Sequence, residues 1–370
     1  MRDNRSMDEV LGQRALNRAT LARQLLLERA SVTPLEAVRR LVGMQAQVPH
    51  NPYTALWSRL AGFQPESLSE LLERRALVRV GVMRGTIHLV TADDCLLLRP
   101  LVQPVFEAQL RRHAEHGPAL RNVKLKPVVE LARTVLAATP RSGIELRAIF
   151  AERLPGLDPA ALAHACQMSL AFVQVPPRGL WGRSAQVKST TAESWLGRPF
   201  VADPSIDSVV LRYFAAFGPA SVADVTTWCR LTGMRAVVER LRPQLVTFRD
   251  ERGRELFDLP DAPRPSERTP APVRFLPEYD NLVLSHDDRS RFFVRADRAA
   301  LAAGWTIGWG SVLHDGLVRG VWRLLPDGLI VRHVERLPKK ALASIAAEGR
   351  RLARFLEADG REVRLVPLSP

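Results

Sequence analysis

Residues 77–90 of the chain read LVRVGVMRGTIHLV, which is two apolar runs on either side of a short connection. The first run covers residues 77–83, the second covers residues 86–90, and Arg84-Gly85 lies between them. Runs rich in β-branched residues that are joined through a glycine predict a β-hairpin. Helical patterns precede this hairpin, and three helices followed by a hairpin is the order of elements in a winged helix-turn-helix.

The helices ahead of the hairpin are marked by three separate signals. Residues 18–28 carry leucines on one helical face. The segment TPLE at 33–36 combines a capping threonine, a proline in the first turn and a glutamate that completes a capping box. The third helix is predicted at about 67–74, whereas residues 1–12 are predicted to be a loose tail.

The same order of elements recurs twice further along the chain. After a longer helix that begins at 91–94, the second set consists of helices at about 126–138, at 144–153 and from 159 onward, and a hairpin-like segment that turns at 176–179. The third set consists of a helix from 205 to 217, a capping box at 221–224, a helix near 234–241, and a hairpin made of 245–249 and 255–259. Because a recurring pattern is the signature of a repeated unit, we expect three tandem winged helix-turn-helix units.

The character of the sequence changes at residues 260–272, PDAPRPSERTPAP, whose prolines predict a stiff linker. Beyond it, Asp-Gly pairs at 315–316 and 327–328 lie between apolar runs, and such pairs are the strongest short signal for a hairpin. A helix at about 339–357 and a strand at 362–367 are predicted to close the chain. The core of this β-rich part is expected to contain Trp305, Trp309 and Trp322.

The predicted fold is therefore α+β, with three tandem winged helix-turn-helix units followed by a small β-rich, barrel-like C-terminal domain. A chain of 370 residues exceeds what one hydrophobic core usually serves, which agrees with several domains. The predicted division is 13–95 for the first unit, 96–200 for a linking helix and the second unit, 201–260 for the third unit, 261–272 for the linker and 273–370 for the C-terminal domain.

The formal net charge of +14 indicates a polyanionic partner. Only five of the 53 basic residues are lysines. Coding in a GC-rich genome would explain arginine in place of lysine, but it would not explain the excess of basic over acidic residues. Arginine also suits DNA, since its planar guanidinium binds phosphate oxygens in pairs and enters narrow minor grooves. The charge therefore predicts a nucleic-acid partner, and the winged helix-turn-helix order makes double-stranded DNA the expected one.

Several other classes of protein are disfavoured by the sequence. No apolar run approaches the roughly 20 residues that cross a bilayer, and the N-terminus lacks the apolar segment of a signal peptide, so we expect a cytoplasmic protein with no membrane partner. Cys95, Cys166 and Cys229 lie far apart in apolar surroundings and are expected to be buried thiols. The eight histidines are scattered, and neither a metal site nor a cofactor is expected.

The segment MQAQVPHNPY at 44–53 is the most unusual part of a sequence that contains no Gly-rich phosphate loop, no HExxH and no G-x-S-x-G. Gln45 and Gln47 lie where prolines are expected to force a helix to end. In an extended exit, residues i and i+2 point to the same side, so both amides would face one water molecule or one sugar. From the spacing alone, however, a solvated helix end is the commoner interpretation.

The chain resembles the AlkZ/YcaQ family of winged-helix DNA glycosylases over nearly its whole length. The segments that carry the resemblance are LNRATLARQLLL at 16–27, VRRLVGMQAQVPHNPYTALWSRL at 38–60, VRVGVMRGTIHLVTADD at 78–94, FLPEYDNLVLSHDDR at 275–289 and GLVRGVWR at 316–323. The resemblance implies three tandem winged helices with a β-barrel-like end. It also implies that Gln45 and Gln47 are catalytic as a Gln-Φ-Gln motif, here with the small Ala46 in the middle.

The resemblance further implies the removal of N7-alkylguanine-type lesions from DNA, and some members of the family unhook interstrand cross-links left by antibiotics. A purine alkylated at N7 is already cationic and leaves as a neutral base, so it needs no general acid, in contrast to ordinary glycoside hydrolysis. A glutamine carbonyl accepts a hydrogen bond from the attacking water but is no strong base. We therefore expect a monofunctional glycosylase that uses two neutral amides.

Five further residues are expected to contact DNA or to line the pocket. They are Arg84, His88, His50, Asn51 and Tyr53. Arg84 lies at the turn of the first wing, where it suits a phosphate or a groove. In the C-terminal FLPEYDNLVLSHDDR segment, Asp280 is expected to cap or tie a turn rather than to act chemically.

Two alternatives remain open. A winged-helix transcriptional regulator would use a recognition helix and often binds a palindromic site as a dimer. Three units in one chain provide an extended DNA-contacting surface without a partner, and we expect a monomer. A protein that sequesters an alkylating drug would not need a basic surface. Replacement of Gln45 separates enzyme from regulator, because a regulator would keep its DNA binding and lose nothing else.

Overall fold

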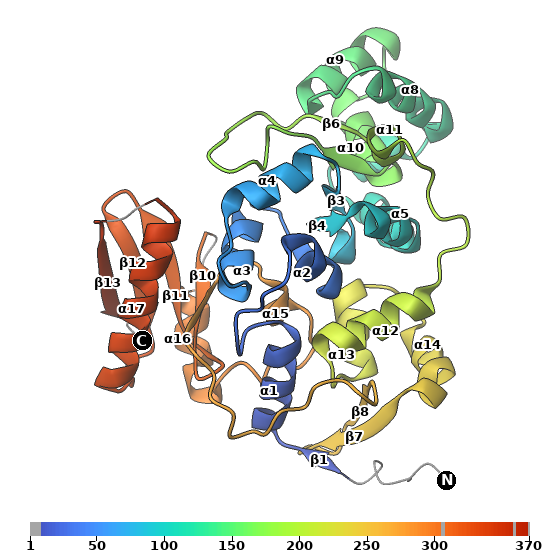
Figure 1. Cartoon of the computed structure of the whole chain (residues 1–370). Helices are drawn as coiled ribbons and strands as arrows, with labels where there is room; N and C mark the ends of the chain where they lie inside the picture. The colour runs from blue at the N-terminus through green and yellow to red at the C-terminus, as the bar shows by residue number, and fades with distance from the viewer. Residues whose placement is uncertain (1–8, 305–307, 358–359, 369–370) are drawn as a thin grey trace.

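The computed structural model describes residues 9–304, 308–357 and 360–368, and the fold is a mixed α+β one (Figure 1). The C-terminal sheet lies on one side of the molecule and the helical sets with their small strands lie on the other, with α1 (Gln13–Arg23) between them. Within the described ranges, no helix combines the length and the apolar character that a membrane span requires.

The first set of elements contains the predicted hairpin. Its elements are α2 (Pro34–Arg40), β2 (Met44–Gln45), α3 (Asn51–Arg59), α4 (Pro65–Glu73), β3 (Leu77–Gly81), the 3₁₀ turn η1 (Met83–Gly85) and β4 (Ile87–Thr91). Thr33 forms the predicted capping box with Glu36, which fixes the start of α2. β4 pairs antiparallel with β3 on one side and with β2 on the other.

The second set continues the same sheet. It follows α5 (Ala92–Leu101), α6 (Gln103–Arg112) and α7 (His116–Leu120), and it consists of α8 (Leu125–Ala138), α9 (Gly143–Arg153), α10 (Pro159–Ser169), β5 (Phe172–Gln174) and β6 (Ser189–Thr191), with α11 (Ala192–Leu196) after it. β5 pairs antiparallel with β3, so one five-stranded sheet runs in the order β2-β4-β3-β5-β6. The first two sets are therefore joined by backbone hydrogen bonds between their hairpins.

The third set has a sheet of its own. Its elements are α12 (Ile206–Phe217), α13 (Val222–Cys229), α14 (Met234–Leu241), the 3₁₀ turn η2 (Arg242–Gln244), β7 (Val246–Asp250) and β8 (Glu255–Asp258). The short strand β1 (Val10–Leu11) pairs parallel with β7. The prediction of a loose tail is thus wrong for residues 10 and 11, because their backbone extends this sheet. Residues 1–8 lie outside the described ranges.

Each set repeats one order of elements, namely a helix, a short extended segment, two helices and a hairpin. In each set the extended segment pairs with the last strand of the hairpin. The paired residues are Gln45 with His88 in the first set, Arg141 with Ser189 in the second and Ala220 with Phe257 in the third. The same long-range pairing in three stretches that are not visibly alike in sequence indicates a repeated structural unit.

The C-terminal part is an open sheet, so the prediction of a barrel is wrong. The strands β9 (Arg274–Leu276), β10 (Gly310–His314), β11 (Leu317–Leu325), β12 (Gly328–His333) and β13 (Glu362–Pro367) lie in the order β13-β12-β11-β10-β9. A barrel needs its first and last strands to pair, whereas β9 and β13 are the two edges of this sheet. Instead, α17 (Lys339–Phe355) packs against the sheet and covers apolar side chains.

Several local predictions for the C-terminal part are confirmed. Asp315-Gly316 connects β10 to β11, and the predicted hairpin of β11 and β12 forms as well, although its turn is Pro326-Asp327 and Gly328 already belongs to β12. Trp309 and Trp322 are buried as predicted, and Trp305 lies outside the described residues. The connection between β9 and β10 contains α15 (Asn281–Leu284), the 3₁₀ turn η3 (Arg295–Asp297) and α16 (Arg298–Gly304).

Helix α1 joins the third set to the C-terminal part. Leu21 in α1 shares a buried apolar cluster with residues of the C-terminal sheet, and α1 also packs against α12. Arg23 forms a buried ion pair with Asp258 at the end of β8. The Pro-rich segment runs along α1, whose arginines donate to its carbonyl oxygens. These bonds join Arg14 to Glu267 at 2.8 Å, Arg18 to Thr269 at 2.6 Å and Arg23 to Pro263 at 3.2 Å.

Some helices differ from their predicted bounds. The prediction of 18–28 for the first helix is wrong, because the chain leaves α1 at Gln24 and Leu25 then takes a left-handed φ of 57°. Helix α3 has no predicted counterpart. The prolines at 49 and 52 suggest a break in the chain, but Pro52 occupies the first turn of α3, where its missing N–H is harmless.

The connections around the second set also differ from their prediction. The long helix expected after residues 91–94 is two helices, α5 and α6, which meet at Val102. The predicted turn at 176–179 belongs to a longer connection between β5 and β6.

The three cysteines are buried free thiols, as predicted. They are Cys95, Cys166 and Cys229, and burial raises their pKa values to about 12, 12 and 11.

Candidate active site

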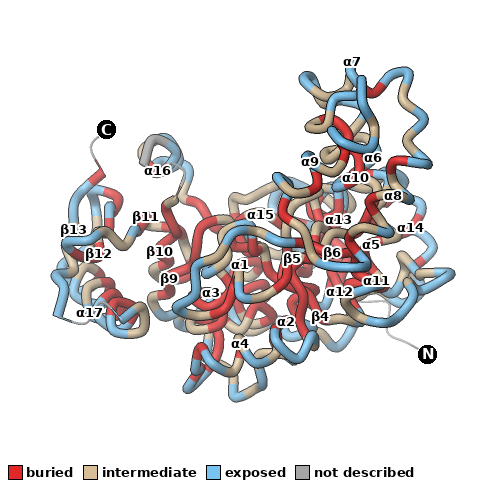
Figure 2. Tube along the Cα trace, turned by 90° about the horizontal axis from the view of Figure 1, so that it is seen from above, coloured by how far each residue is buried: buried red, intermediate tan, exposed pale blue. Residues whose placement is uncertain are grey.

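A large cleft of about 1360 Å³ opens between the β3–β4 hairpin with its turn η1, called the wing below, α6, α10, the start of α14 and the segment around α15. Figure 2 shows α6 and α7 projecting from the body on the same side as α15 and α16. The arginines that line the cleft are Arg84, Arg111, Arg112 and Arg230. Among the described residues of its lining there is no aspartate, glutamate or lysine. The cleft is therefore a positively charged hollow that suits a polyanion.

Gln45 ends β2 and lines this cleft. Its backbone pairs with His88 of β4, which fixes β2 beside the wing. Its side-chain oxygen accepts a hydrogen bond of 2.9 Å from Nη2 of Arg84. A guanidinium has only donors, so this contact turns the carbonyl end of the amide toward Arg84. An amide oxygen has two lone pairs and can accept a second hydrogen bond from a molecule in the cleft.

Arg84 lies at the turn of the first wing and is held by neutral acceptors. It takes a left-handed φ of 59°, and Gly85 follows with a φ of 70°. Besides the bond to Gln45, its Nη2 donates to Oδ1 of Asn281 at 3.0 Å and to Nε2 of His88 at 3.4 Å. Its Nη1 is buried, and no described residue accepts a hydrogen bond from it. Burial lowers the pKa of Arg84 to about 10, so the guanidinium stays charged at neutral pH.

His88 supports Arg84 as a neutral acceptor. It is fully buried in β4, and its Nδ1 lies 2.9 Å from the carbonyl oxygen of Thr86. A carbonyl oxygen can only accept, so Nδ1 carries the ring proton and Nε2 faces Arg84 as an acceptor. Burial and the neighbouring Arg84 lower the pKa of His88 to about 3. His88 is therefore not a general acid at neutral pH.

Gln47 lies on the other side of the wing. It is exposed, it lines a separate recess of about 110 Å³, and its side-chain oxygen accepts a hydrogen bond of 3.3 Å from the backbone N–H of Ile87. Ala46 is fully buried between the two glutamines, with its N–H bonded to the carbonyl of Ile87 at 2.8 Å and its carbonyl bonded to Arg79 at 2.9 Å. The Gln-Ala-Gln segment is thus anchored on both sides, while its two amides face different hollows.

None of the three residues predicted to follow the glutamine pair into the pocket lines the cleft. Asn51 donates a bond of 2.7 Å to the carbonyl oxygen of Glu278 and so ties α3 to the C-terminal part. Tyr53 is buried, its hydroxyl donates to a carbonyl in the connection between β5 and β6, and burial raises its pKa to about 12. His50 is exposed at the N-cap of α3.

Known proteins share both the sequence pattern and the fold of this chain. A family model described as DNA glycosylase AlkZ-like matches residues 38–355. The chain belongs to this family. A relative from Streptomyces sahachiroi, described as an interstrand DNA cross-link repair glycosylase, is 26% identical over 371 aligned positions, which cover 88% of this chain and 92% of the relative. The solved structure of Streptomyces sahachiroi DNA glycosylase AlkZ matches with a TM-score of 0.70 at 23% identity, and the match covers 96% of this chain and 100% of that chain.

The predicted resemblance to the AlkZ-like family is confirmed, and the structural match shows that the chain shares the AlkZ fold. Asn281 is the member of this site that sequence reasoning missed. It is buried at the start of α15, where its Oδ1 accepts from Arg84 and its Nδ2 donates to the carbonyl oxygen of Gly43 at 3.2 Å. The resemblance of residues 275–289 to the family was the signal that could have identified Asn281. The sequence does not show that this segment lies beside the wing, which only the folded chain reveals.

Asp280 ties a turn, as predicted. Its carboxylate caps α15 by accepting from the backbone N–H of Leu282 at 2.9 Å. The same carboxylate accepts two hydrogen bonds of 2.8 Å from the guanidinium of Arg59 in α3. The segment beside the candidate site is therefore fixed to the first set of elements by a buried ion pair.

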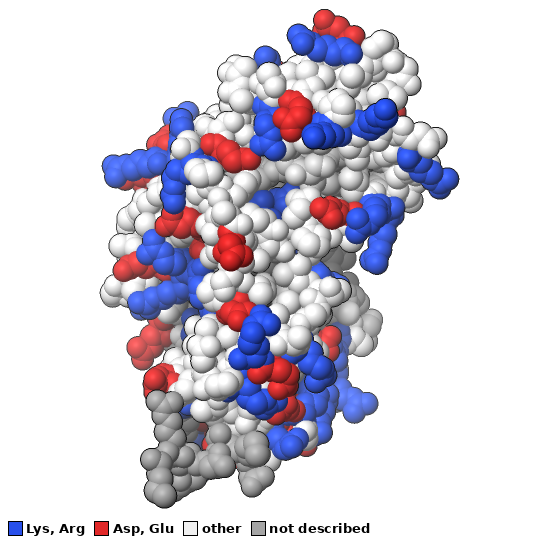
Figure 3. All heavy atoms as spheres, turned by 90° about the vertical axis from the view of Figure 1, so that its right-hand side faces the viewer, with Lys and Arg blue, Asp and Glu red and all other residues white. Residues whose placement is uncertain are grey.

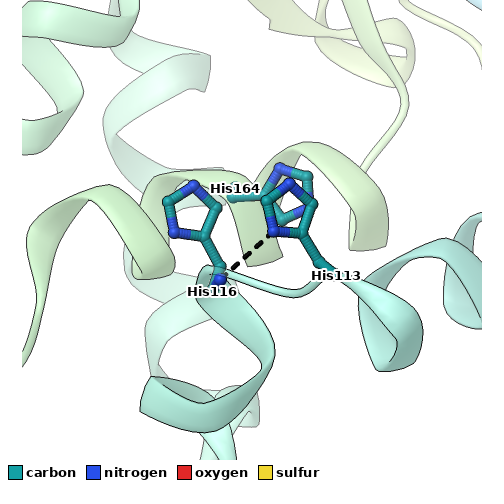
Figure 4. Close-up of side chains that lie close together, drawn as sticks. All are labelled: His113, His116 and His164. Carbon is teal, nitrogen blue, oxygen red and sulfur yellow. Dashed lines mark hydrogen bonds between the residues drawn. The ribbon is translucent and has the colours of Figure 1, made fainter.

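The structure also gathers three histidines that are scattered in the sequence. His113 follows α6, His116 begins α7 and His164 lies in α10 (Figure 4). One ring nitrogen of each lies within 4.8 Å of those of the other two. The spacing His113-x-x-His116 was the local signal for such a cluster, whereas His164 joins it only through packing of α10. The prediction of no metal site rests on the scattered positions of the histidines in the sequence, and it did not foresee that three of them lie together in the fold.

Charge on the outer surface differs from charge in the cleft. On the face shown in Figure 3, basic and acidic side chains are interspersed. Several arginines elsewhere form ion pairs with carboxylates, such as Arg133 with Glu193 and Arg240 with Asp207. The lining of the cleft contains no described carboxylate, although Arg111 of the lining lies 3.9 Å from Glu107, which is not part of it. The lining of the cleft is therefore more one-sidedly basic than the face shown in Figure 3, which favours an anionic ligand there.

Proposed function

We propose that the chain is a monofunctional DNA glycosylase that hydrolyses the N-glycosidic bond of purines alkylated at N7 in double-stranded DNA. The observation that carries the proposal is the position of Gln45 on the wall of a large, arginine-lined cleft without a described carboxylate in its lining. Arginines suit the phosphates of a duplex. A neutral amide suits a lesion whose leaving group needs no general acid.

The proposed reaction has two parts, departure of the base and capture of water. The bond between C1′ of the sugar and N9 of the purine breaks, and its electron pair neutralises the cationic base. The sugar becomes oxocarbenium-like. A water oxygen then bonds to C1′ and its proton passes to solvent, which leaves an abasic site. The carbonyl oxygen of Gln45 would orient this water by accepting a hydrogen bond, without taking the proton.

Gln47 is proposed as a second catalytic amide. In the free protein its oxygen holds the backbone N–H of Ile87 at 3.3 Å, which is a long and therefore weak hydrogen bond. Gln47 is also exposed, so its side chain can exchange this contact for one to a bound nucleotide at little cost. We propose that DNA bound across the wing brings both amides to the damaged nucleotide.

Arg84 is proposed to bind a phosphate beside the lesion. Its Nη1 is a buried donor without a described acceptor, and a buried polar group without a partner costs free energy until a ligand satisfies it. A phosphate oxygen would satisfy it with a charge-assisted hydrogen bond. Because the same guanidinium donates to Gln45, phosphate binding and orientation of the amide would be coupled.

The absence of lysine from the described lining supports a monofunctional reaction. An enzyme that also cleaves the DNA strand uses an amine to form a Schiff base with the sugar aldehyde. With no such amine in the described lining, water is the proposed nucleophile and the abasic strand stays intact. The mechanism needs no cofactor.

The size of the cleft supports bulky lesions. Pockets for small molecules usually measure about 300–1,000 Å³, whereas this cleft measures about 1360 Å³. The relative from Streptomyces sahachiroi is described as acting on interstrand cross-links. We propose that this chain also unhooks cross-links made by a DNA-alkylating antibiotic and so gives self-resistance.

The repeated order of elements supports a DNA-binding architecture. We propose that the three sets are winged helix-turn-helix units within 13–95, 96–200 and 201–260, followed by the linker 261–272 and the C-terminal domain 273–370. Three such units in one chain form an extended surface without a second copy, so we propose that the protein acts as a monomer on cytoplasmic DNA.

The proposal is tested with a duplex that carries one N7-methylguanine. After incubation, alkali converts abasic sites into strand breaks. We expect cleavage at the lesion by the wild-type protein and a rate about 10²–10³-fold lower for Gln45→Ala, the range seen when one preorganised polar contact to a transition state is removed. Gln47→Ala is expected to lose activity as well. Samples without alkali should remain uncleaved.

Gln64→Ala is the matched control, because Gln64 is an exposed glutamine outside the cleft that precedes α4. It should retain the wild-type rate. Tight, salt-sensitive binding to undamaged duplex without release of the base would contradict the glycosylase proposal and favour a transcriptional regulator. Cleavage without alkali would contradict the monofunctional part alone.

A further inference from the structure

The three histidines beside the cleft take no part in the proposed glycosylase reaction. The rings of His113 and His116 are nearly parallel, with centroids 4.6 Å apart and planes at 9° (Figure 4). The ring of His164 lies 4.3 Å from that of His113 and 5.0 Å from that of His116. Two imidazoles from the corner between α6 and α7 and one from α10 thus lie side by side.

Two of these rings have buried nitrogens without a partner. Nδ1 of His116 and Nε2 of His164 accept or donate no hydrogen bond among the described residues. Buried polar atoms in native structures are almost always satisfied, so these two nitrogens are available to a ligand. Neutral imidazole, whose unprotonated ring nitrogen carries a lone pair, is the form of histidine that binds metal ions.

We propose that His113, His116 and His164 bind one divalent transition-metal ion of the Zn²⁺ class. The three candidate nitrogens lie within 4.8 Å of one another. Tetrahedral Zn²⁺ with bonds of about 2.0–2.1 Å places its ligand atoms about 3.3 Å apart. The nearly parallel rings of His113 and His116 must rotate about their side-chain bonds to close this difference when the ion binds. Three protein ligands leave one position of the ion open to water.

The donor set selects the kind of metal. Imidazole nitrogens suit Zn²⁺, Ni²⁺ and Cu²⁺, whereas Mg²⁺ and Ca²⁺ require the oxygen ligands that these three side chains do not supply. Arg111 and Arg112 line the same part of the cleft and oppose a cation. Nδ1 of His113 also accepts a bond of 3.1 Å from the backbone N–H of His116, which metal binding by the neutral ring must replace. We therefore expect weaker binding than at a closed structural zinc site.

The position of the site indicates a structural role. The ion would join the corner between α6 and α7 to α10, and Figure 2 shows this corner projecting from the body. His113 and His164 belong to the lining of the cleft, so the bound ion would stiffen one of its walls. No step of base release passes through this site, and the inference stands or falls independently of the glycosylase proposal.

Metal binding by the tag-free, full-length protein tests the inference. The protein is stripped with a chelator and dialysed against Zn²⁺ in excess Mg²⁺, and bound zinc is counted. We expect one Zn²⁺ per chain, and an affinity at least about tenfold lower for His116→Gln and His164→Gln. His314→Gln, at a half-exposed histidine of β10, is the matched control and should bind like wild type. Zn²⁺ should raise the Tm of wild type and of this control only.

Co²⁺ absorption provides a second readout that does not depend on the variants. Coordination of Co²⁺ by imidazole nitrogens gives a visible band, which Zn²⁺ should abolish by displacement. Far-ultraviolet circular dichroism identifies which variants remain folded. Lack of stoichiometric zinc in the wild-type protein, absence of the Co²⁺ band, or equal zinc affinity of folded His164→Gln and wild type would each overturn the inference.

Discussion

Asp280 and Asn281 are neighbours in the chain, but they hold two buried arginines in different ways. Asp280 accepts two hydrogen bonds of 2.8 Å from Arg59, and both side chains of this ion pair are almost completely buried. Asn281 accepts one hydrogen bond of 3.0 Å from Arg84, whose other acceptors, Gln45 and His88, are also neutral. One guanidinium is neutralised inside the protein, and the other keeps its charge.

The difference separates a structural arginine from a functional one. The pair of Arg59 with Asp280 ties α3 to α15 and has no charge left for a ligand. Burial of Arg84 without a described carboxylate costs free energy, which its lowered pKa reports. A folded protein keeps a buried charge of this kind where binding of a substrate compensates for the unfavourable burial. Neutral amides therefore position Arg84 while its charge remains available to a DNA phosphate.

The largest expected effect follows from removing the carboxylate beside Arg59, so that Arg59, like Arg84, is buried among neutral acceptors. Asp280→Asn leaves the charge of Arg59 buried without a carboxylate. We expect the free energy of unfolding to fall by about 3–5 kcal/mol, as when one partner of a buried ion pair is removed. Urea denaturation with a constant m-value measures this loss. A decrease below about 1 kcal/mol would mean that the buried pair is not what fixes α15.

The converse exchange gives Arg84 a carboxylate. Asn281→Asp pairs the buried charge of Arg84 but loses the hydrogen bond from Nδ2 to the carbonyl oxygen of Gly43, so we expect a small change in the stability to urea. The new carboxylate should oppose a phosphate at Nη1. We expect single-turnover release of N7-methylguanine to slow by about 10–100-fold, equivalent to about 1–3 kcal/mol, the cost of an impaired buried polar contact. A wild-type rate in a stable Asn281→Asp protein would contradict the assignment of Arg84 to substrate.

The pH dependence of stability sharpens the same comparison. His88 has a pKa of about 3 in the folded protein and an ordinary value of about 6.5 when unfolded, so only the unfolded chain gains its proton as pH falls between these values. Stability is thus highest above pH 6.5 and decreases on acidification. We expect His88→Asn to flatten this decrease by up to about 1.4 kcal/mol per pH unit, measured by urea denaturation at pH 7, 6 and 5.

His286 is the internal reference for that measurement, because it is fully buried and its pKa is also lowered to about 3. The His88→Asn protein should therefore keep the part of the pH dependence of stability that His286 contributes. Equal slopes for His88→Asn and wild type would show that His88 gains its proton over the same pH range in the folded and unfolded states, which contradicts its role as a buried neutral acceptor.

The smallest expected effect concerns the salt dependence of DNA binding. Arg84→Met removes one proposed phosphate contact, so the slope of log affinity against log salt should decrease in magnitude by about 0.9. Fluorescence anisotropy with undamaged duplex at several salt concentrations measures the slope. Arg364→Met, which removes an arginine paired with Asp327 at the edge strand β13, is the control. An unchanged slope for Arg84→Met would remove Arg84 from the phosphate contacts.

Much of the local structure could be predicted because it depends on neighbouring residues. The capping box of Thr33 with Glu36 forms as its spacing indicates. α14 and β13 have their predicted bounds, 234–241 and 362–367. The failures have the same origin. Pro52 opens a helix instead of closing one, because a proline without an N–H is compatible with both positions and packing decides between them.

The candidate site could be predicted only in part. The family resemblance identified the segment of Gln45 and Gln47 and the wing that carries Arg84. The local spacing of the two glutamines suggested one shared hollow, but pairing of β2 with β4 places their amides against different parts of the wing. Asn281 was not identified, since nothing within its own segment shows that it meets Arg84, 197 positions earlier in the chain.

The sequence by itself determined the order of helices and strands, the excess of positive charge and the family, because these follow from local patterns and from resemblance. Only the tertiary structure decided that the hairpins of the first two sets share one sheet, that the C-terminal sheet stays open, and that Arg84 lacks a described carboxylate while Arg59 has Asp280. These features depend on pairings between distant segments, and their free energies come from burial and hydrogen bonds that exist only in the folded chain.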